Sequence, residues 1–269
     1  MGASEFGARP SESLILVTVK SYDTEKLADS IGHLIDKDGI VVSLQNGLGN
    51  IETVARRFGS QQVLGGRVIF GSEMVAPGRV RVTVIAQPVA IGPAPKIHGD
   101  ECANLHARAI EIAAAINSAG VPAEAVDDIT PVLWLKVLYN VAMNPLGALL
   151  RCHYGALGEV AETRSIMEDA VTEAFAVSQN LHVDLGFRSA DDFIGHLYDK
   201  LLPPTYDHRP SMLYDLEKRG RTEIEALNGM IVQLGERYSV PTPVNRMLTS
   251  MIHARERLVR AQLSIPAGE

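Results

Sequence analysis

One stretch, residues 131–150 (PVLWLKVLYNVAMNPLGALL), constrains the fold of this chain more than any other. Val, Leu, Trp, Ala and Met fill most of its positions, which predicts a helix buried in a core. The stretch nevertheless carries Lys136, Asn140 and Asn144 at intervals of four residues. At about 3.6 residues per turn these side chains fall within about 80° of one another, so we expect one narrow polar stripe along the helix.

Lys136 is the residue of this stripe that most needs an explanation. Removing an ammonium from water is costly unless partners compensate, so a lysine in such a helix is a candidate proton donor facing a cleft. In the alternative interpretation its stem follows the apolar surface and the ammonium reaches water. The two Asn side chains would then only hydrogen-bond helix ends, since Pro145 follows Asn144. The helix alone leaves both interpretations open.

Composition narrows the class of protein. A chain of 269 residues, 46% of them apolar, can form one large or two modest domains. With a net charge of -7 and no polybasic block, nucleic acid is not an expected partner, whereas a small neutral or acidic metabolite is. Only two cysteines are present, without a CxxC pair or a secretory segment, which predicts a cytoplasmic protein. No apolar run of roughly 18 residues lacks polar breaks, and neither a membrane span nor a metal site is predicted.

The first half of the chain has the pattern of a parallel sheet. LILVTVK (14–20) and IVVSL (40–44) are typical of strands buried on both faces, and residues 23–35 between them are helical in pattern. This order predicts a right-handed strand, helix, strand unit. The polar turn QNGLGN and a helix over 51–58 follow the second strand. Because ligands of parallel sheets lie beyond the carboxyl ends of strands, Lys20 and Asn46 are candidate ligand contacts.

The remaining patterns divide the chain in two. Residues 63–92 predict shorter strands with a hairpin turn at 76–78 and one solvent-facing side, and residues 101–119 predict a helix. From residue 131 on the patterns are helical, over 131–150, 158–181, 190–200, 222–238 and 244–263. We therefore expect an α/β, partial Rossmann-like (doubly wound) domain over residues 1–125 and an all-helical domain over 126–269.

The phosphate-binding turn of a doubly wound dinucleotide domain has no counterpart in this pattern. Such a domain begins with a strand, a GxGxxG turn and a helix whose N-terminus meets the pyrophosphate. The nearest glycines, Gly47 and Gly49, lack a third glycine and follow the second strand. Their value as a phosphate loop is therefore weak.

Five ordered segments resemble one family. They are VTVKSYDT, SLQNGLGN, WLKVLYNVAMNPLGALL, SMLYDLEKRGRTEIEALNG and VPTPVN. In this order and spacing, over about residues 14–257, they resemble the ketopantoate reductase (2-dehydropantoate 2-reductase) family. The resemblance implies a Rossmann-like domain followed by a helical domain, with NADPH and the keto acid in the cleft between them. It also implies reduction of ketopantoate to pantoate in pantothenate biosynthesis.

The resemblance implies roles for individual residues. The matching positions are the catalytic Lys136 and its acidic partner Glu223, the keto-acid contacts Asn140, Asn144 and Ser211, and Lys20 and Asn46 near the nicotinamide. An Asn that some members carry ten residues beyond Asn144 is Tyr154 here, which leaves the exact substrate open.

These residue types suit ketone reduction. Negative charge builds on the ketone oxygen as hydride arrives, and an ammonium such as that of Lys136 can stabilise and protonate it. A carboxylate such as that of Glu223 can hold the ammonium in place, while amides and a hydroxyl orient the substrate. In the structural alternatives Glu223 and Ser211 cap helices and Asn46 belongs to a simple turn.

Three functions remain open from the sequence: ketopantoate reduction, reduction of another branched 2-keto acid, and a catalytically silent dimeric fragment. Because the GxGxxG turn is lacking, we expect the 269-residue chain to bind NADPH weakly or not at all. In the strand order 3-2-1-4-5-6 the strand over 14–20 normally pairs with the first strand, so it is expected at an uncovered edge. A homodimer would cover that edge, and the alternative is a cap formed by residues 1–13.

Overall fold

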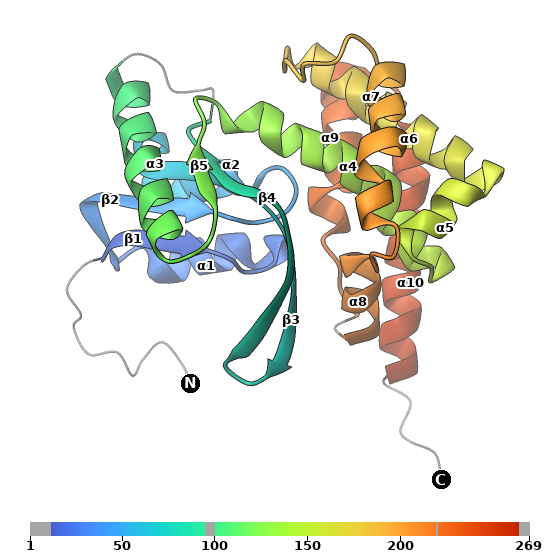
Figure 1. The fold of residues 1–269 in the computed structure, drawn as a ribbon, viewed down its shortest axis with the longest axis horizontal. Coiled ribbons are helices and arrows are strands. Elements are labelled where there is room, and N and C mark those ends of the chain that lie inside the picture. The colour runs from blue at the N-terminus through green and yellow to red at the C-terminus, as the bar shows by residue number, and fades with distance from the viewer. Residues whose placement is uncertain (1–11, 95–99, 219, 264–269) are drawn as a thin grey trace. The chain divides into compact units, whose positions relative to one another are not determined.

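The computed structural model describes residues 12–94, 100–218 and 220–263 (Figure 1). The chain divides into two compact units, and the boundary along the sequence lies between Leu133 and Trp134. The first unit is a sheet covered by helices and the second is helical, which confirms the predicted fold class. The sequence placed the boundary after residue 125. The structure places it further along because the start of the next helix packs on the sheet, where Ile129 and Leu133 form a cluster with Ala90.

The described residues of the first unit form a five-stranded sheet in the order β1-β2-β3-β4-β5. The pairs β1–β2, β2–β3 and β4–β5 are parallel, and β3–β4 is antiparallel. The strands are β1 (Glu12–Val17), β2 (Ile35–Ser43), β3 (Val63–Ala76), β4 (Arg79–Gly92) and β5 (Ala123–Ala125). The predicted parallel strand, helix, strand unit is thus present, although β2 begins five residues earlier than predicted.

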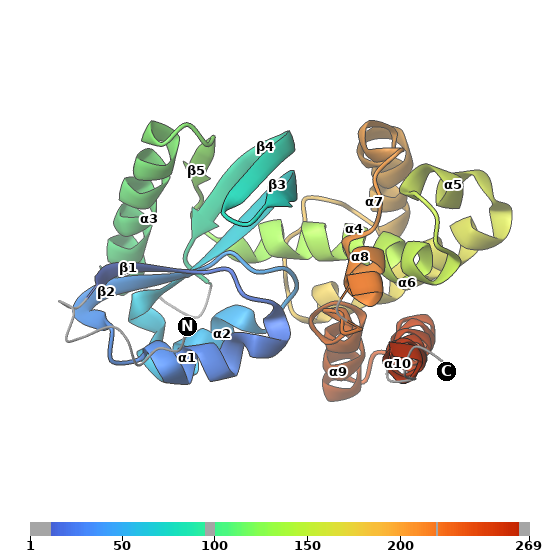
Figure 2. The same cartoon turned by 90° about the horizontal axis from the view of Figure 1, so that it is seen from below.

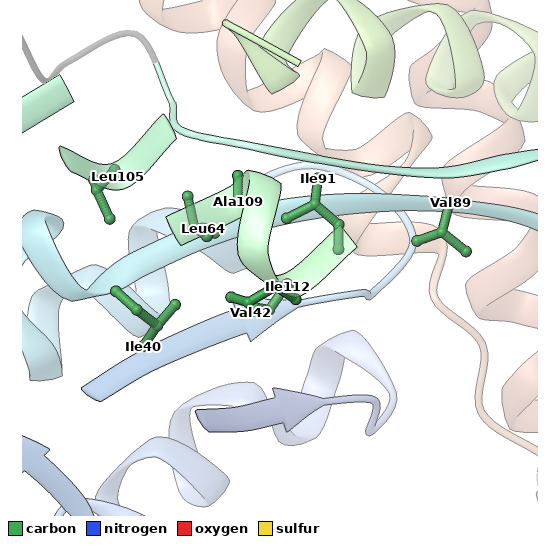
Figure 3. Packing of buried hydrophobic residues seen from close by; sticks show 8 residues of the cluster. All are labelled: Ile40, Val42, Leu64, Val89, Ile91, Leu105, Ala109 and Ile112. Atoms are coloured by element: carbon green, nitrogen blue, oxygen red, sulfur yellow. The ribbon is translucent and has the colours of Figure 1, made fainter. Parts of the chain in front are cut away.

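Helices cover both faces of this sheet (Figure 2). They are α1 (Thr24–Ile31), α2 (Asn50–Phe58) and α3 (Asp100–Ser118), with the short η2 (Ser21–Asp23) and η3 (Ser60–Gln62). Helix α3 packs on one face, in the cluster of Ile40, Val42, Leu64, Val89, Ile91, Leu105, Ala109 and Ile112 (Figure 3). Helices α1 and α2 pack on the other face, in the cluster of Val17, Ala28, Val41, Val54, Phe58 and Val63. Because successive residues of a strand point to opposite faces, Val41 and Val42 serve different cores.

Strand β1 lies at the edge of the sheet, as predicted, but it is not buried on both faces. Leu14 and Leu16 are 38% and 45% exposed, whereas Val17 packs under α1 and α2. The reason is that the core under α3 is built from β2, β3 and β4 and includes no residue of β1 among the described positions. The suggested cap by residues 1–13 falls mainly outside the described residues.

Strands β3 and β4 form a hairpin that extends past the helices of its own unit (Figure 1). Both strands have 14 residues, longer than predicted, and irregularities interrupt their pairing. The predicted turn is present, with Gly78 at φ 73°, a conformation that glycine adopts without strain. Val80 and Val82 are exposed, although the alternating pattern assigned them to a covered side.

The second unit consists of helices. They are α4 (Ile129–Leu150), α5 (Tyr154–Glu159), α6 (Ala161–Asn180), α7 (Ala190–His196), η4 (Leu197–Leu201), η5 (Pro203–Thr205), α8 (Ser211–Lys218), η6 (Ile224–Ala226), α9 (Asn228–Tyr238) and α10 (Pro243–Leu263). Two predicted helices are broken. The one over 158–181 is interrupted at Val160, whose backbone is extended and whose carbonyl accepts from the Thr163 hydroxyl. The one over 222–238 begins as η6 and changes direction at Leu227.

Helix α4 continues through Pro145, which lies in its interior. Proline has no N–H, so the carbonyl of Val141, four residues earlier, loses its normal helical donor. The buried Asn228 side chain donates to this carbonyl through Nδ2 at 3.1 Å and so replaces the missing bond. A side chain from the start of α9 thereby completes the helix that carries the polar stripe.

The same Asn228 joins a buried network at the start of α10. Its Nδ2 also donates to Asn245 Oδ1 at 2.9 Å, and Asn245 Nδ2 donates to Ala170 O at 3.0 Å and to Glu173 Oε2 at 2.8 Å. The Glu173 carboxylate further accepts the backbone N–H groups of Val244 and Asn245. An acidic group is favourable at a helix N-terminus, where N–H groups lack helical partners. The network fixes α4, α6, α9 and α10 to one another.

Candidate active site

The polar stripe predicted on α4 is present in the second unit. Asn140 and Asn144 are buried and Lys136 is half-buried, one turn earlier on the same face. Asn144 Nδ2 donates to Asn140 Oδ1 at 3.0 Å, which shows that the two amides lie along one line. The interpretation that these Asn side chains only serve helix ends is wrong, because α4 runs on to Leu150.

Two hydroxyl groups converge on the amide oxygen of Asn144. The Tyr154 hydroxyl donates to Asn144 Oδ1 at 3.0 Å, and Ser211 Oγ lies 3.5 Å from the same atom. The structure therefore brings together three of the predicted site residues, Asn140, Asn144 and Ser211. It adds Tyr154, which the sequence presented only as a departure from the family pattern.

Tyr154 is held firmly at the start of α5. Its backbone N–H donates to His208 O at 3.1 Å. Its ring packs edge-on against Tyr139, with ring centroids 5.7 Å apart, and also contacts the tilted ring of His208. Burial raises the pKa of the Tyr154 hydroxyl well above its usual value, so the group stays protonated and acts as a donor. Burial also raises the pKa of Tyr139 to about 12, and its hydroxyl pairs with Thr205 Oγ1 at 2.7 Å.

Glu223 is buried directly before η6. Its side chain makes no capping hydrogen bond to that helix, so the capping explanation for this acidic residue fails. A buried carboxylate needs a partner that stabilises its charge, which agrees with the expected pairing to an ammonium. The catalytic roles of Lys136 and Glu223 stay predictions.

Lys20 and Asn46 belong to the first unit, in the segments that follow β1 and β2. These strands are parallel neighbours, so both residues lie at the carboxyl end of the sheet, where the sequence placed them. Gly47 and Gly49 have φ angles of 83° and 87°, which lets the backbone turn tightly beside Asn46. Helix α2 begins immediately afterwards, at Asn50.

A buried polar network that the sequence did not reveal holds these two segments together. Gln45 Nε2 donates to Val19 O at 2.9 Å and to Thr24 Oγ1 at 2.7 Å, and its Oε1 accepts from Ser43 at 3.0 Å. Thr24 Oγ1 lies 3.0 Å from Asn50 Oδ1. Asn50 Nδ2 in turn donates to the backbone oxygen of Asn46 at 2.9 Å, so the network fixes the backbone beside Lys20 and Asn46. The available signal was Gln45, a polar residue directly after a buried strand.

The described residues contain neither a metal cluster nor an exposed apolar span. Within the ranges that the structure describes, no three His, Cys, Asp or Glu side chains gather as possible ligands of a metal ion. Helix α4 is long and apolar enough to cross a membrane by length and composition. However, 67% of the most apolar 18-residue segment of α4 is buried inside the structure, as in a core helix.

Two family models match the sequence. The model described as "Ketopantoate reductase PanE/ApbA" matches residues 7–96, and "Ketopantoate reductase PanE/ApbA C terminal" matches residues 128–256. The chain belongs to the ketopantoate reductase family. Membership confirms the resemblance found in the five sequence segments, and the two matches correspond to the two units of the structure.

Individual members of the ketopantoate reductase family and related structures are similar over most of the chain. The 2-dehydropantoate 2-reductase of Aquifex aeolicus is 40% identical over 244 residues, which cover 90% of this chain and 76% of the relative. A PanE/ApbA family ketopantoate reductase from Ralstonia eutropha JMP134 superposes with a TM-score of 0.78 at 31% identity, covering 93% of this chain and 78% of that one. D-mandelate dehydrogenase, solved with NADH and anilino(oxo)acetate, superposes with a TM-score of 0.81 at 27% sequence identity. The superposition covers 94% of this chain and 79% of the dehydrogenase.

Proposed function

We propose that this chain reduces ketopantoate to pantoate with NADPH, a step of pantothenate biosynthesis. The relatives named 2-dehydropantoate 2-reductase support the substrate and the reaction. The structural observation that carries the proposal is the stripe on α4, where the hydrogen-bonded amides of Asn140 and Asn144 lie on the same helix face as Lys136. It combines a proton donor with groups that can orient the oxygens of a keto acid.

In this proposal Lys136 is the general acid. A bound nicotinamide cofactor supplies hydride to the ketone carbon when the reaction takes place. The C=O electron pair then moves to oxygen, which takes a proton from the Lys136 ammonium, and solvent later restores that proton. Glu223 holds the ammonium in position, and Asn140 and Ser211 orient the substrate before the transfer. Amide and hydroxyl donors suit the carboxylate of a keto acid.

Lys20 and Asn46 fit the nicotinamide end of the cofactor. A primary amide and an ammonium can hydrogen-bond the carboxamide and ribose oxygens of a nicotinamide nucleotide. Both follow neighbouring parallel strands, and the Gln45 network holds their backbone, so the positions are preorganised. The family binds a nicotinamide cofactor, and the choice of NADP rather than NAD is part of the proposal.

A second candidate is reduction of another branched 2-keto acid. The observation in its favour is Tyr154, whose buried aromatic ring stands where some family members have an asparagine. D-mandelate dehydrogenase, which is similar in fold, was solved with a different small acid, anilino(oxo)acetate. A panel of 2-keto acids therefore belongs in the same assay.

We also propose that the chain forms a homodimer in the cytoplasm. Among the described residues β1 is the outermost strand of the sheet and exposes Leu14 and Leu16, and natural proteins normally cover or pair such an edge. The cytoplasmic assignment rests on the sequence and on two cysteines that are both free.

The test is steady-state kinetics of the purified chain with ketopantoate and other 2-keto acids, followed by the loss of NADPH or NADH absorbance. The proposal expects the highest kcat/KM for ketopantoate with NADPH, measured at cofactor concentrations high enough to offset the weak NADPH binding that the missing GxGxxG turn predicts. A higher value for another branched acid would favour the second candidate. No turnover of any acid with either cofactor would favour a catalytically silent chain.

A further inference from the structure

We propose that Tyr154 is a positioning residue that fixes the polarity of the amides on α4, so that Asn140 offers an N–H group to an acceptor oxygen of the substrate. The inference rests on the proposed function, because it assigns that oxygen to a 2-keto acid. It gives a role to the one position where this chain departs from the expected pattern of asparagines.

The argument begins with the direction of each hydrogen bond. A primary amide has a donor end and an acceptor end, and it can turn over unless its partners prefer one orientation. The Tyr154 hydroxyl donates to Asn144 Oδ1, and Ser211 Oγ approaches the same oxygen. With its oxygen fixed by these hydroxyls, Asn144 must direct Nδ2 toward Asn140, where it meets Oδ1 at 3.0 Å.

The orientation of Asn144 then determines that of Asn140. Because Asn140 Oδ1 is taken as an acceptor, its Nδ2 points away from Asn144 and offers two N–H groups. Within the described ranges, the structure gives this nitrogen no hydrogen-bond acceptor of its own. Asn140 is largely buried and retains 7% of its surface, and the proposal has the substrate oxygen approach it there. The series of hydrogen bonds from Tyr154 through Asn144 to Asn140 thus leaves the Asn140 N–H groups as donors for a ligand.

Tyr154 is suited to set this direction. Its ring lies between Tyr139 and His208, and its backbone is tied to the loop before α8, so the hydroxyl has little freedom to move. Full burial keeps the hydroxyl protonated, which agrees with its raised pKa. An asparagine at this position could present either its oxygen or its nitrogen to Asn144. A tyrosine hydroxyl can also accept, but if Asn144 turned its Nδ2 toward Tyr154, the buried O–H would lose Asn144 Oδ1, the acceptor that the described residues give it, so the arrangement with Oδ1 facing Tyr154 is favoured.

The consequence for the site is selectivity for acceptor groups. A carboxylate or ketone oxygen accepts the Asn140 N–H groups, while an N–H group at the same place would face another donor. An unsatisfied polar contact of this type strongly disfavours the wrong ligand. Tyr154 therefore favours the acid over the corresponding primary amide without touching either.

The experiment compares Tyr154→Phe with Tyr139→Phe as a matched control. Both variants remove one hydroxyl, from the buried ring of Tyr154 or from the half-buried ring of Tyr139 on α4, but Tyr139 pairs with Thr205 and not with the amides. The first measurement is the NMR spectrum of the ¹⁵N-labelled side-chain amides in the 269-residue protein, without ligand. The proposal expects the Asn140 and Asn144 NH₂ signals to shift or broaden in Tyr154→Phe and to remain in place in Tyr139→Phe.

The second measurement is the ratio of kcat/KM for ketopantoate to that for its primary amide. We expect Tyr154→Phe to reduce this ratio at least about tenfold, the size of one hydrogen bond to a charged group, mainly through KM. Tyr139→Phe should leave the ratio unchanged. A lost packing contact would weaken both ligands alike, so this ratio separates positioning from structural support.

The outcomes distinguish this inference from the proposed function. If the wild type reduces ketopantoate but Tyr154→Phe keeps both the ratio and the NMR signals, the inference is overturned and the function stands. If the wild type reduces no keto acid, the NMR signals still test the direction of the amides. Should Tyr154→Phe not fold, Ser211→Ala removes the other hydroxyl near Asn144 Oδ1 and should shift the same signals, and unchanged signals would overturn the inference.

Discussion

Truncation of Asn245 to alanine is expected to destabilise the second unit severely. Asn245 is fully buried, with 0% of its surface exposed, and its side chain takes part in three hydrogen bonds at 2.8 to 3.0 Å. Two of them join neutral groups and contribute about 1 kcal/mol each, and the bond to the Glu173 carboxylate contributes roughly 2 kcal/mol. The expected loss is therefore about 4 kcal/mol. At about 2–4 °C per kcal/mol for a chain of this size, the melting temperature should fall by roughly 10 °C.

Circular dichroism during thermal unfolding can measure this loss against two companion variants. Arg246, the residue next to Asn245, forms an exposed ion pair with Glu236. Arg246→Ala removes this pair, and we expect it to shift the melting temperature by less than about 2 °C. Asn245→Asp keeps the size of the side chain but places a carboxylate oxygen against Glu173. It should be at least as destabilising as Asn245→Ala near neutral pH. If Asn245→Ala melts within about 2 °C of the wild type, the view that this network holds α10 is wrong.

Three further outcomes are expected. Lys136→Ala should lower kcat for ketopantoate by roughly 10²- to 10⁴-fold with the melting temperature preserved, and turnover near that of the wild type would remove Lys136 as the general acid. Light scattering at micromolar concentration should give a mass near twice 29.1 kDa, and a monomer mass throughout a dilution series would contradict the dimer. Partial desolvation lowers the pKa of His208, so the unfolded chain binds that proton more readily. Its contribution to stability is present above about pH 6.5 and lost as the pH falls below it. The difference between the melting temperature above about pH 6.5 and the one below it should be smaller in His208→Gln than in the wild type.

Features that depend on neighbours along the chain could be predicted from the sequence. The bond between Asn144 and Asn140 is local to one helix, so the four-residue spacing was enough to anticipate the stripe. The parallel β1 and β2 followed in the same way from two β-branched runs with a helix between them. The polar contacts that complete the site come from other helices, since Tyr154 reaches Asn144 from α5 and Ser211 approaches it from α8. Periodicity carries no information about such partners.

The errors have a common physical origin. Leu14 and Leu16 look like core residues in the sequence, and only the position of α3 over the neighbouring strands shows that one face of β1 is uncovered. Val160 and Leu227 are apolar residues that continue the helical pattern of the sequence, yet the backbone leaves the helical conformation at both. Burial and backbone direction are set by the whole fold, whereas propensity describes a residue in isolation.

The repair of α4 by Asn228 has a consequence for how this sequence can change over time. Pro145 is tolerated because the amide of another helix serves the carbonyl that the proline leaves unpaired. Substitutions at the two positions are therefore not independent. Loss of Asn228 should be more harmful in a chain with Pro145 than in one with alanine there, where the backbone supplies the bond itself. A lineage that acquires the proline should first have acquired the asparagine, so the order of the two mutations decides whether the intermediate chain remains stable.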